Sequence, residues 1–123
     1  KVCGRKTQRI MKASFHINSK AIYIEHGRRQ IPFEQITHLE GDINYTIIHT
    51  LDGKKTIAAF TLKKFSDIIE KGLFVRTHKS FIINLLHLKS YQVNDSKIIM
   101  QGNKSLVVSR RRKKELKKAL NLH

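Results

Sequence analysis

The chain has 123 residues, of which 25 are Lys or Arg and nine are Asp or Glu, so its formal net charge at pH 7 is +16. This length suits one domain with a buried core, and a hydrophobic content of 40% is typical of a globular chain. The sequence contains no signal peptide and no apolar run near the ~18 residues of a membrane span. The only cysteine, Cys3, excludes an internal disulfide and a cysteine-based zinc cage, and it favours a reducing, cytoplasmic location.

The positive charge points to an anionic partner. Repulsion between so many cations destabilises the compact state, and a polyanion offsets that repulsion. Nucleic acid, an acidic membrane surface and an acidic protein are the candidate partners, and the net charge alone does not choose between them.

The amino-terminal segment differs in composition from the rest. Residues 1–13 are basic and contain no acid, and we interpret them as a linker or lead-in segment before one domain at 14–123. Because Lys1 is not a methionine, we expect the chain to be a piece of a longer protein.

Short β patterns fill the first half of this domain. Alternating or β-branched apolar residues recur at close spacing, and the lone Pro32 suits an edge strand. We expect turns at Gly41–Asp42 and at Asp52–Gly53, the second being a strong hairpin signal. The expected strands are 15–17, 21–24, 31–33, 36–39, 45–51 and 54–60.

A helix is predicted in the middle of the chain. Thr61 is a suitable N-cap, and the apolar period then changes to that of a helix ending at Gly72. The apolar residues assigned to its buried face are Leu62, Phe65, Ile68 and Ile69.

The last third returns to β patterns and ends in a second helix. Strand-like segments run from Phe74 to Val108, with turns at Asn94–Asp95 and Gly102–Asn103. Ser109 is the expected cap of a short, basic helix with Leu116, Ala119 and Leu120 on its inner face. The sequence therefore predicts a mostly β domain of small antiparallel sheets, with one middle helix and one C-terminal helix.

No catalytic or metal-binding pattern is complete. Gly53-Lys54-Lys55-Thr56 resembles the tail of a phosphate-binding loop, but Lys55 stands where Ser or Thr is needed, and Ile48 replaces the required second glycine. None of the seven histidines pairs at the i, i+4 spacing of a helical zinc site, and His78 near Ser80 has no evident acid to complete a triad. We expect no enzyme activity, no cofactor and no metal.

The arginines before the last helix are the strongest local signal. Arg110, Arg111 and Arg112 lie at a helix start, where the helix dipole disfavours each cation by a few tenths to ~1 kcal/mol. A solvated helix face is the simple alternative. Arginine, however, suits bidentate contacts with guanine edges or phosphates, so the cluster favours nucleic acid.

Several segments resemble one known family, the LytTR DNA-binding domain. Residues 73–85, Leu-Phe-Val-Arg-Thr-His-Lys-Ser-Phe-Ile-Ile-Asn-Leu, are similar to its central signature, and residues 106–114 to its closing signature. Upstream, residues 36–47 resemble its strand–turn–strand, and Thr61–Leu62 its helix opening. The resemblance covers about residues 14–120.

The resemblance implies an elongated fold and a function. Such domains read double-stranded DNA in the major groove with loops, as the output domains of bacterial transcription regulators. The implied partners are duplex DNA and an upstream receiver or sensor domain of a two-component response regulator. The lack of a long apolar helix or heptad predicts an isolated monomer that occupies paired half-sites on DNA.

The resemblance also implies which residues contact DNA. The expected contacts are Asn44, Tyr45, His78, Lys79, Arg110, Arg111, Arg112, Lys113, Lys114 and Lys117. Arg110 matches the family's base-reading arginine. Lys79 could contact either a base or a phosphate. The ring of Tyr45 could either pack within the domain or contact a base.

Some residues of the signatures favour structural roles. We expect His78 to act more as a structural hydrogen-bonding residue than as a base reader, and Asn84 to satisfy backbone groups. Phe74, Phe81 and Ile83 are assigned to the core.

Two other functions compete with duplex DNA binding. An RNA- or ribosome-binding protein needs exposed aromatic rings for stacking, yet most aromatics here fall at core-like positions. A protein-interaction or membrane-surface module needs a broad apolar face on its terminal helix, and the inner face of that helix is too small.

Overall fold

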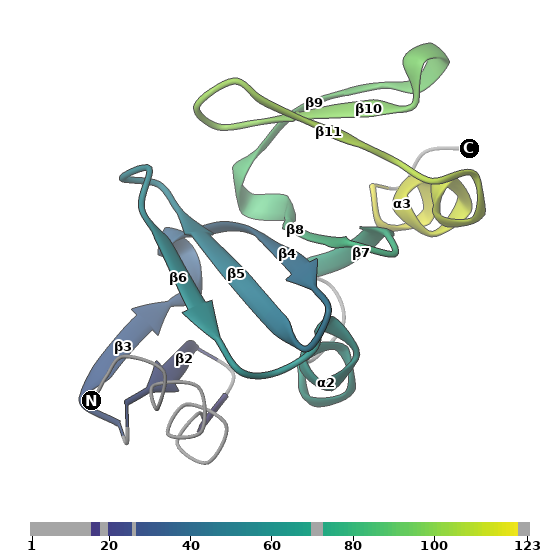
Figure 1. Cartoon of the computed structure of the whole chain (residues 1–123). Coiled ribbons are helices and arrows are strands. Elements are labelled where there is room, and N and C mark those ends of the chain that lie inside the picture. Colours follow the sequence, from purple (N-terminus) through teal and green to yellow (C-terminus); the bar gives the residue numbers. More distant parts are fainter. Residues whose placement is uncertain (1–15, 18–19, 26, 70–72, 121–123) are drawn as a thin grey trace.

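The computed structural model describes residues 16–17, 20–25, 27–69 and 73–120 of the chain (Figure 1). The basic segment 1–13 lies outside these residues. Three antiparallel sheets and two α-helices make up the described part, which confirms the mostly β class with one middle and one C-terminal helix.

The sheets follow one another along the molecule, with the largest in the middle (Figure 1). The first sheet is β1 (His16–Ile17), β2 (Ala21–Ile24) and β3 (Arg29–Pro32), and Pro32 lies on its edge strand as expected. The middle sheet has the order β6-β5-β4-β8-β7, with β4 (Ile36–Asp42), β5 (Tyr45–Thr50), β6 (Lys55–Ala58), β7 (Phe74–His78) and β8 (Phe81–Asn84). The last sheet has the order β11-β10-β9, with β9 (Leu88–Gln92), β10 (Lys97–Met100) and β11 (Lys104–Val107).

Helices and short 3-10 turns connect and cover the sheets. The α-helices are α2 (Leu62–Ile68) and α3 (Lys113–Ala119). The 3-10 turns are η1 (Phe33–Gln35), η2 (Leu85–His87), η3 (Val93–Asp95) and η4 (Arg110–Arg112).

The middle sheet separates two hydrophobic cores. Successive side chains of a strand point to opposite faces, so Phe74 and Ile82 enter the first core, whereas Val75 and Ile83 enter the second. The first core lies toward β2, β3 and α2, and the second toward the last sheet and α3. The core assignment of Phe74 and Ile83 is confirmed, and Phe81 packs half-buried against the second core.

The middle helix begins where the sequence predicts it, but it ends at Ile68 rather than at Gly72, because the C-cap residue Ile69 has an extended backbone (ψ 143°). One side chain is also placed differently. The Thr61 hydroxyl accepts a hydrogen bond from the Lys64 N–H at 3.2 Å, which confirms the cap. Leu62 and Phe65 are buried, but Ile68 is 43% exposed, so its assignment to the buried face is wrong. At 100° per residue, Ile68 lies about 60° beyond Phe65 on the side away from Leu62, and so leaves that face.

The first hairpin of the middle sheet turns later than the sequence indicates. Gly41 and Asp42 belong to β4, and the turn is Ile43–Asn44, because Asp42 pairs with Tyr45. The expected turn at Gly41–Asp42 is therefore wrong. β4 continues because its end is held by β8 as well as by β5, a non-local pairing with no local sequence signal.

Asn84 joins the two halves of the middle sheet to the first core. Its side chain is fully buried, and Nδ2 donates hydrogen bonds to the carbonyls of Phe33 at 2.9 Å and Ile36 at 2.8 Å. Its Oδ1 accepts from the Leu86 N–H at 2.9 Å. The prediction that Asn84 satisfies backbone groups is confirmed.

Replacing Asn84 should therefore be costly. Asn84→Ala leaves buried backbone groups without these partners and should lower the free energy of unfolding by about 3 kcal/mol. Urea unfolding followed by circular dichroism measures the loss. Asn94→Ala, at an exposed position in η3, is the matched control and should stay within about 0.5 kcal/mol of the parent. A loss below about 1 kcal/mol for Asn84→Ala would contradict the role given to its side chain.

Candidate nucleic-acid interface

Two turns lie side by side at one end of the middle sheet. The Gly41 N–H donates to the Ser80 carbonyl at 2.8 Å, and Glu40 of β4 pairs with Phe81 of β8. The β4–β5 turn and the β7–β8 turn are therefore neighbours. This pairing brings together the expected contacts Asn44 and Tyr45 with His78 and Lys79, although more than thirty positions separate them in the sequence.

The arginine cluster reaches the same end of the sheet through Ser109. The backbone N–H of Ser109 donates to the Thr77 carbonyl at 2.8 Å, so η4 begins beside the last residues of β7. The Ser109 side chain makes no cap hydrogen bond, contrary to expectation. The Arg112 N–H donates instead to the Ser109 carbonyl at 3.0 Å and closes the 3-10 turn.

The three arginines do not share one environment. Arg110 and Arg111 are exposed, and neither forms an ion pair among the described residues. Arg112 is half-buried, and its guanidinium lies 3.9 Å from the carboxylate of Glu115. Arg110 and Arg111 are thus the members of the cluster most available to an anion.

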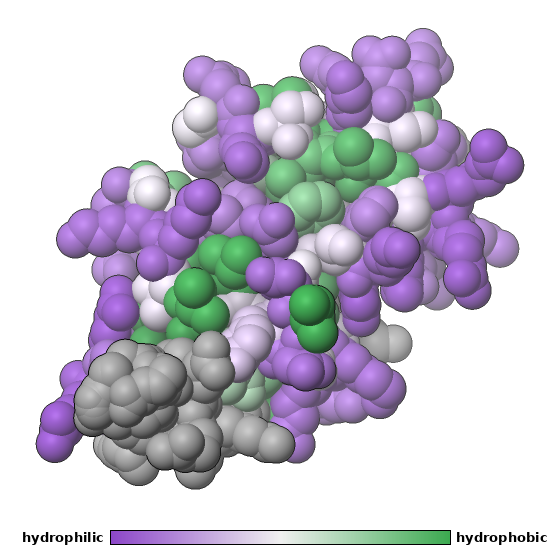
Figure 2. Space-filling view, in the orientation of Figure 1, coloured by the Kyte–Doolittle hydropathy of each residue, from purple (hydrophilic) through white to green (hydrophobic). Residues whose placement is uncertain are grey.

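The last helix carries further cations, which continue from the arginine cluster along α3. Leu116 is fully buried in the second core with Val75, so α3 packs along β7. Lys113 and Lys114 lie in the first turn of α3, next to the arginine cluster, and Lys117 lies one turn farther along. Hydrophilic residues cover the surface around α3 (Figure 2).

The β7–β8 turn is fixed by its own side chains. The His78 Nδ1 atom accepts a hydrogen bond from the Ser80 N–H at 3.1 Å, and its ring packs on Phe81 with 5.6 Å between centroids. These contacts agree with a structural role for His78. They leave Lys79 exposed at the tip of a two-residue turn.

Arg76 completes this arrangement and was missed by the sequence analysis. Its guanidinium donates to the His78 carbonyl at 3.3 Å and to the Lys79 carbonyl at 2.6 Å. Burial, and then the positive charge of Arg112, lower the pKa of Arg76 from its usual value. A cation between the buried residues Val75 and Thr77 was the available signal, because a half-buried charge needs partners.

The described residues contain neither a membrane-spanning helix nor a metal cluster. No helix among them is long and apolar enough to cross a membrane. In the same part of the chain, no group of three or more His, Cys, Asp or Glu side chains is placed to hold a metal ion.

Comparison with known proteins identifies the family. Residues 26–121 match the family model of the LytTr DNA-binding domain. The chain belongs to the LytTR family. A solved LytTr DNA-binding domain from Bacillus cereus, described as that of a methyl-accepting/DNA response regulator, has the same fold, with a TM-score of 0.71 and 23% sequence identity. The match covers 85% of this chain and 100% of that chain, and no curated protein sequence matches significantly.

Family membership confirms the resemblance read from the sequence, and with it the fold class. It makes this chain a DNA-binding domain of the kind that regulators carry, in a family that binds DNA and is not a catalytic one. DNA is therefore the partner that family membership implies for this chain.

In this LytTR domain, the shape of the β7–β8 turn should depend on Arg76. Arg76→Lys keeps the charge but loses the planar fork that reaches two carbonyls, and DNA affinity should fall about tenfold. Fluorescence anisotropy measures the affinity. Arg29→Lys is the matched control, because Arg29 also donates a hydrogen bond, to Thr56 at 3.0 Å, but lies in the first sheet. Equal affinities of Arg76→Lys and the parent would contradict this role.

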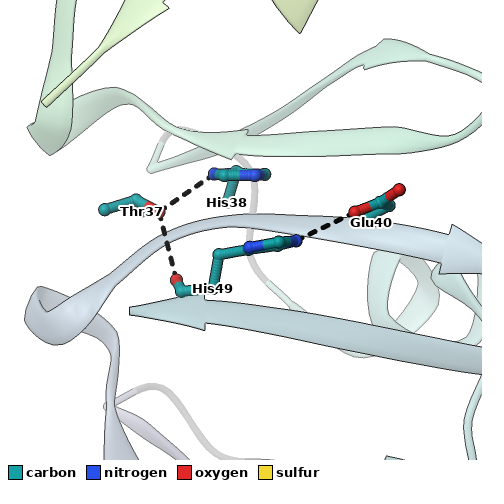
Figure 3. A network of polar contacts seen from close by, with 4 residues as sticks. All are labelled: Thr37, His38, Glu40 and His49. Carbon is teal, nitrogen blue, oxygen red and sulfur yellow. Dashed lines mark hydrogen bonds and ion pairs between the residues drawn. The ribbon is translucent and has the colours of Figure 1, made fainter. Parts of the chain in front are cut away.

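A network of polar side chains braces the β4–β5 hairpin of the LytTR domain (Figure 3). His38 and His49 face each other across the two strands and stack with 4.1 Å between ring centroids. His49 Nε2 lies 2.9 Å from the Glu40 carboxylate, and Thr37 donates to the His49 carbonyl at 3.1 Å. The network cross-links β4 and β5, the two strands that the turn with Asn44 connects. It therefore stiffens the support of that turn.

The network also assigns the protonation of His38. The single hydroxyl proton of Thr37 goes to the His49 carbonyl, so Thr37 Oγ1 accepts from His38 Nδ1–H at 2.9 Å. In the described part of the chain, His38 Nε2 is buried without a hydrogen-bond partner. Burial, with the charges of His49 and Lys104, lowers the pKa of His38 from 6.5 to about 3.

Acid should destabilise this LytTR domain through His38. Between pH 6.5 and about pH 3, His38 is protonated in the unfolded chain but not in the folded chain. The free energy of unfolding therefore decreases as the pH is lowered through this range. Between pH 7 and pH 5 the loss from His38 should be about 2 kcal/mol.

The measurement compares urea unfolding of the parent and His38→Gln at both pH values. The other ionisable groups are common to both proteins, so the difference between the two slopes isolates His38. The variant should lose about 2 kcal/mol less than the parent over this range. Equal losses would show that His38 is not held neutral by the fold.

Proposed function

We propose that this chain binds double-stranded DNA sequence-specifically, with its turn cluster in the major groove. We define the turn cluster as the β4–β5 turn, the β7–β8 turn and η4. The observation that carries the proposal is the meeting of these three segments at one end of the middle sheet, with exposed cations at Lys79, Arg110 and Arg111. Separate loops on a rigid sheet can enter a groove without a recognition helix.

The members of the cluster suit different parts of DNA. The exposed fork of Arg110 suits the two acceptors of a guanine edge, which are unique to the major groove. Lys79 is a point charge on a fixed turn and suits either a guanine or a phosphate. Lys113, Lys114 and Lys117 continue the positive surface along α3 and suit the phosphate backbone.

The β4–β5 turn suits bases more than phosphates. It contains no cation, and Asp42 beside it is exposed and would be repelled by a phosphate. Asn44 is exposed, and an amide side chain can pair with the donor and acceptor of an adenine edge. Tyr45 is half-buried at the start of β5, which favours packing for its ring.

Duplex DNA fits the surface better than single-stranded RNA does. Every Phe and Tyr among the described residues is buried or half-buried, so the chain offers few rings for stacking on unpaired bases. In contrast, the cations Lys79, Arg110 and Arg111 of the turn cluster are exposed.

We further propose the biological context of a bacterial two-component response regulator in the cytoplasm. The solved Bacillus cereus domain belongs to a response regulator, which supports this context for a chain of the same fold. In such a protein a receiver or sensor domain precedes the DNA-binding domain, and two copies occupy paired half-sites.

Three alanine variants test base reading against mere charge. A duplex selected from a random library by this chain serves as the specific site, and a scrambled duplex serves as the reference. Arg110→Ala should lose about 1–3 kcal/mol on the selected duplex and much less on the scrambled one. Lys114→Ala should weaken both similarly and lower the salt slope by about one.

Lys54→Ala is the control for loss of charge alone. Lys54 is exposed in the β5–β6 turn, at the opposite end of β5 from the turn cluster, and its removal should change neither affinity appreciably. Titrations at several salt concentrations give affinity and slope together. If Arg110→Ala weakens both duplexes equally, Arg110 contacts only phosphate.

A further inference from the structure

Ile43, at the tip of the β4–β5 turn, is unusually exposed. Its side chain leaves 89% of its surface exposed, more than any other large hydrophobic side chain among the described residues. A side chain so exposed gains almost nothing from packing within the domain. The fold itself therefore does not require an isoleucine at this position.

The backbone of Ile43 adds a second cost. Its φ is +56°, in the left-handed region that Gly, Asn and Asp tolerate and β-branched residues avoid. Of the four non-glycine residues with positive φ in the described part of the chain, Ile43 alone is β-branched. A glycine or asparagine here would make the same turn with less strain. Strain that the fold does not need points to function.

The position of Ile43 indicates what it could contact. The Gly41 N–H bond to Ser80 places the β4–β5 turn beside Lys79, within the turn cluster. The flanking residues Asp42 and Asn44 are exposed and carry no positive charge. An apolar tip beside a carboxylate does not suit a phosphate, but it does suit the floor of a groove.

We propose that Ile43 is a specificity-determining residue that contacts the methyl group of a thymine in the major groove. Thymine alone among the bases presents an apolar group there, and its recognition requires an apolar side chain at van der Waals distance. The strained backbone fixes the direction of the side chain, and the high exposure leaves it free to be buried on binding. This inference rests on the proposed function and deepens it.

Thymine-to-deoxyuridine replacement tests the contact directly. Deoxyuridine lacks only the methyl group and pairs with adenine as thymine does. In the duplex that this chain selects from a random library, each thymine is replaced in turn, and affinity is measured with the parent and Ile43→Gly. One replacement should weaken the parent about three- to fourfold, the value of one buried methyl group.

The variant decides whether Ile43 causes that loss. Ile43→Gly fits the positive φ, so its Tm should not fall below that of the parent. It should bind the thymine duplex more weakly than the parent does, and the same deoxyuridine replacement should have no further effect. Ile43→Val, which keeps an apolar β-branched side chain, should retain most of the methyl effect.

Leu51→Ala is the matched control. Leu51 is 50% exposed in the β5–β6 turn, at the other end of β5, and this variant should show the full deoxyuridine loss. The inference is overturned if the loss caused by every deoxyuridine replacement is the same in the parent and in Ile43→Gly. Base reading by the domain would still stand in that case. If no sequence is enriched in the selection, the proposed function fails and this inference fails with it.

Discussion

The pairing of β4 with β8 is the contact on which the rest of the molecule depends. It joins two hairpins that are distant in the sequence and places both of their turns at one end of the sheet. Asn84 secures the far end of this seam through the carbonyls of Phe33 and Ile36, and the Gly41 N–H secures the near end through Ser80. A Cβ at Gly41 would lie 3.0 Å from Leu62 Cδ1, so glycine lets α2 approach β4 closely at this point.

The exposed cations depend in turn on a second seam, between β7 and the segment that leads into α3. The bond from Ser109 to Thr77 brings the arginine cluster to the turn that holds Lys79, and burial of Leu116 keeps α3 along β7. Within this seam the charges of Arg76 and Arg112 repel each other, and carbonyl oxygens and Glu115 offset the repulsion. Polar partners inside the domain thus hold Arg76 and Arg112, whereas Arg110 and Arg111 are exposed and form no ion pair among the described residues.

Local signals predicted most of the elements, because their causes are local. The Asp52–Gly53 hairpin, the Thr61 cap and the strands of the last sheet each need only neighbouring residues, and all are present. The error at Gly41 has a non-local cause, since its backbone N–H is bound by Ser80, far away in the sequence. At Ser109, a 3-10 turn of three arginines separates the expected cap from α3. The three expected contact regions were predicted from the family signatures. The distances between them in the sequence do not indicate that they meet in the fold. Arg76 escaped notice for a different reason, since its partners are backbone carbonyls only two and three residues away, which a pattern of side chains does not indicate.

The domain combines a rigid support with an unfavourable tip. Below the turn cluster, the network of His38, His49 and Glu40 and the buried Asn84 hold the strands with hydrogen bonds. In the cluster itself, an isoleucine has a strained backbone and exposed arginines lie together without ion pairs among the described residues. Such features lower the stability of the free domain, and the proposed duplex would neutralise the charges and bury the exposed isoleucine side chain. The hydrogen bonds of this support hold this end of the sheet in one shape in the absence of DNA.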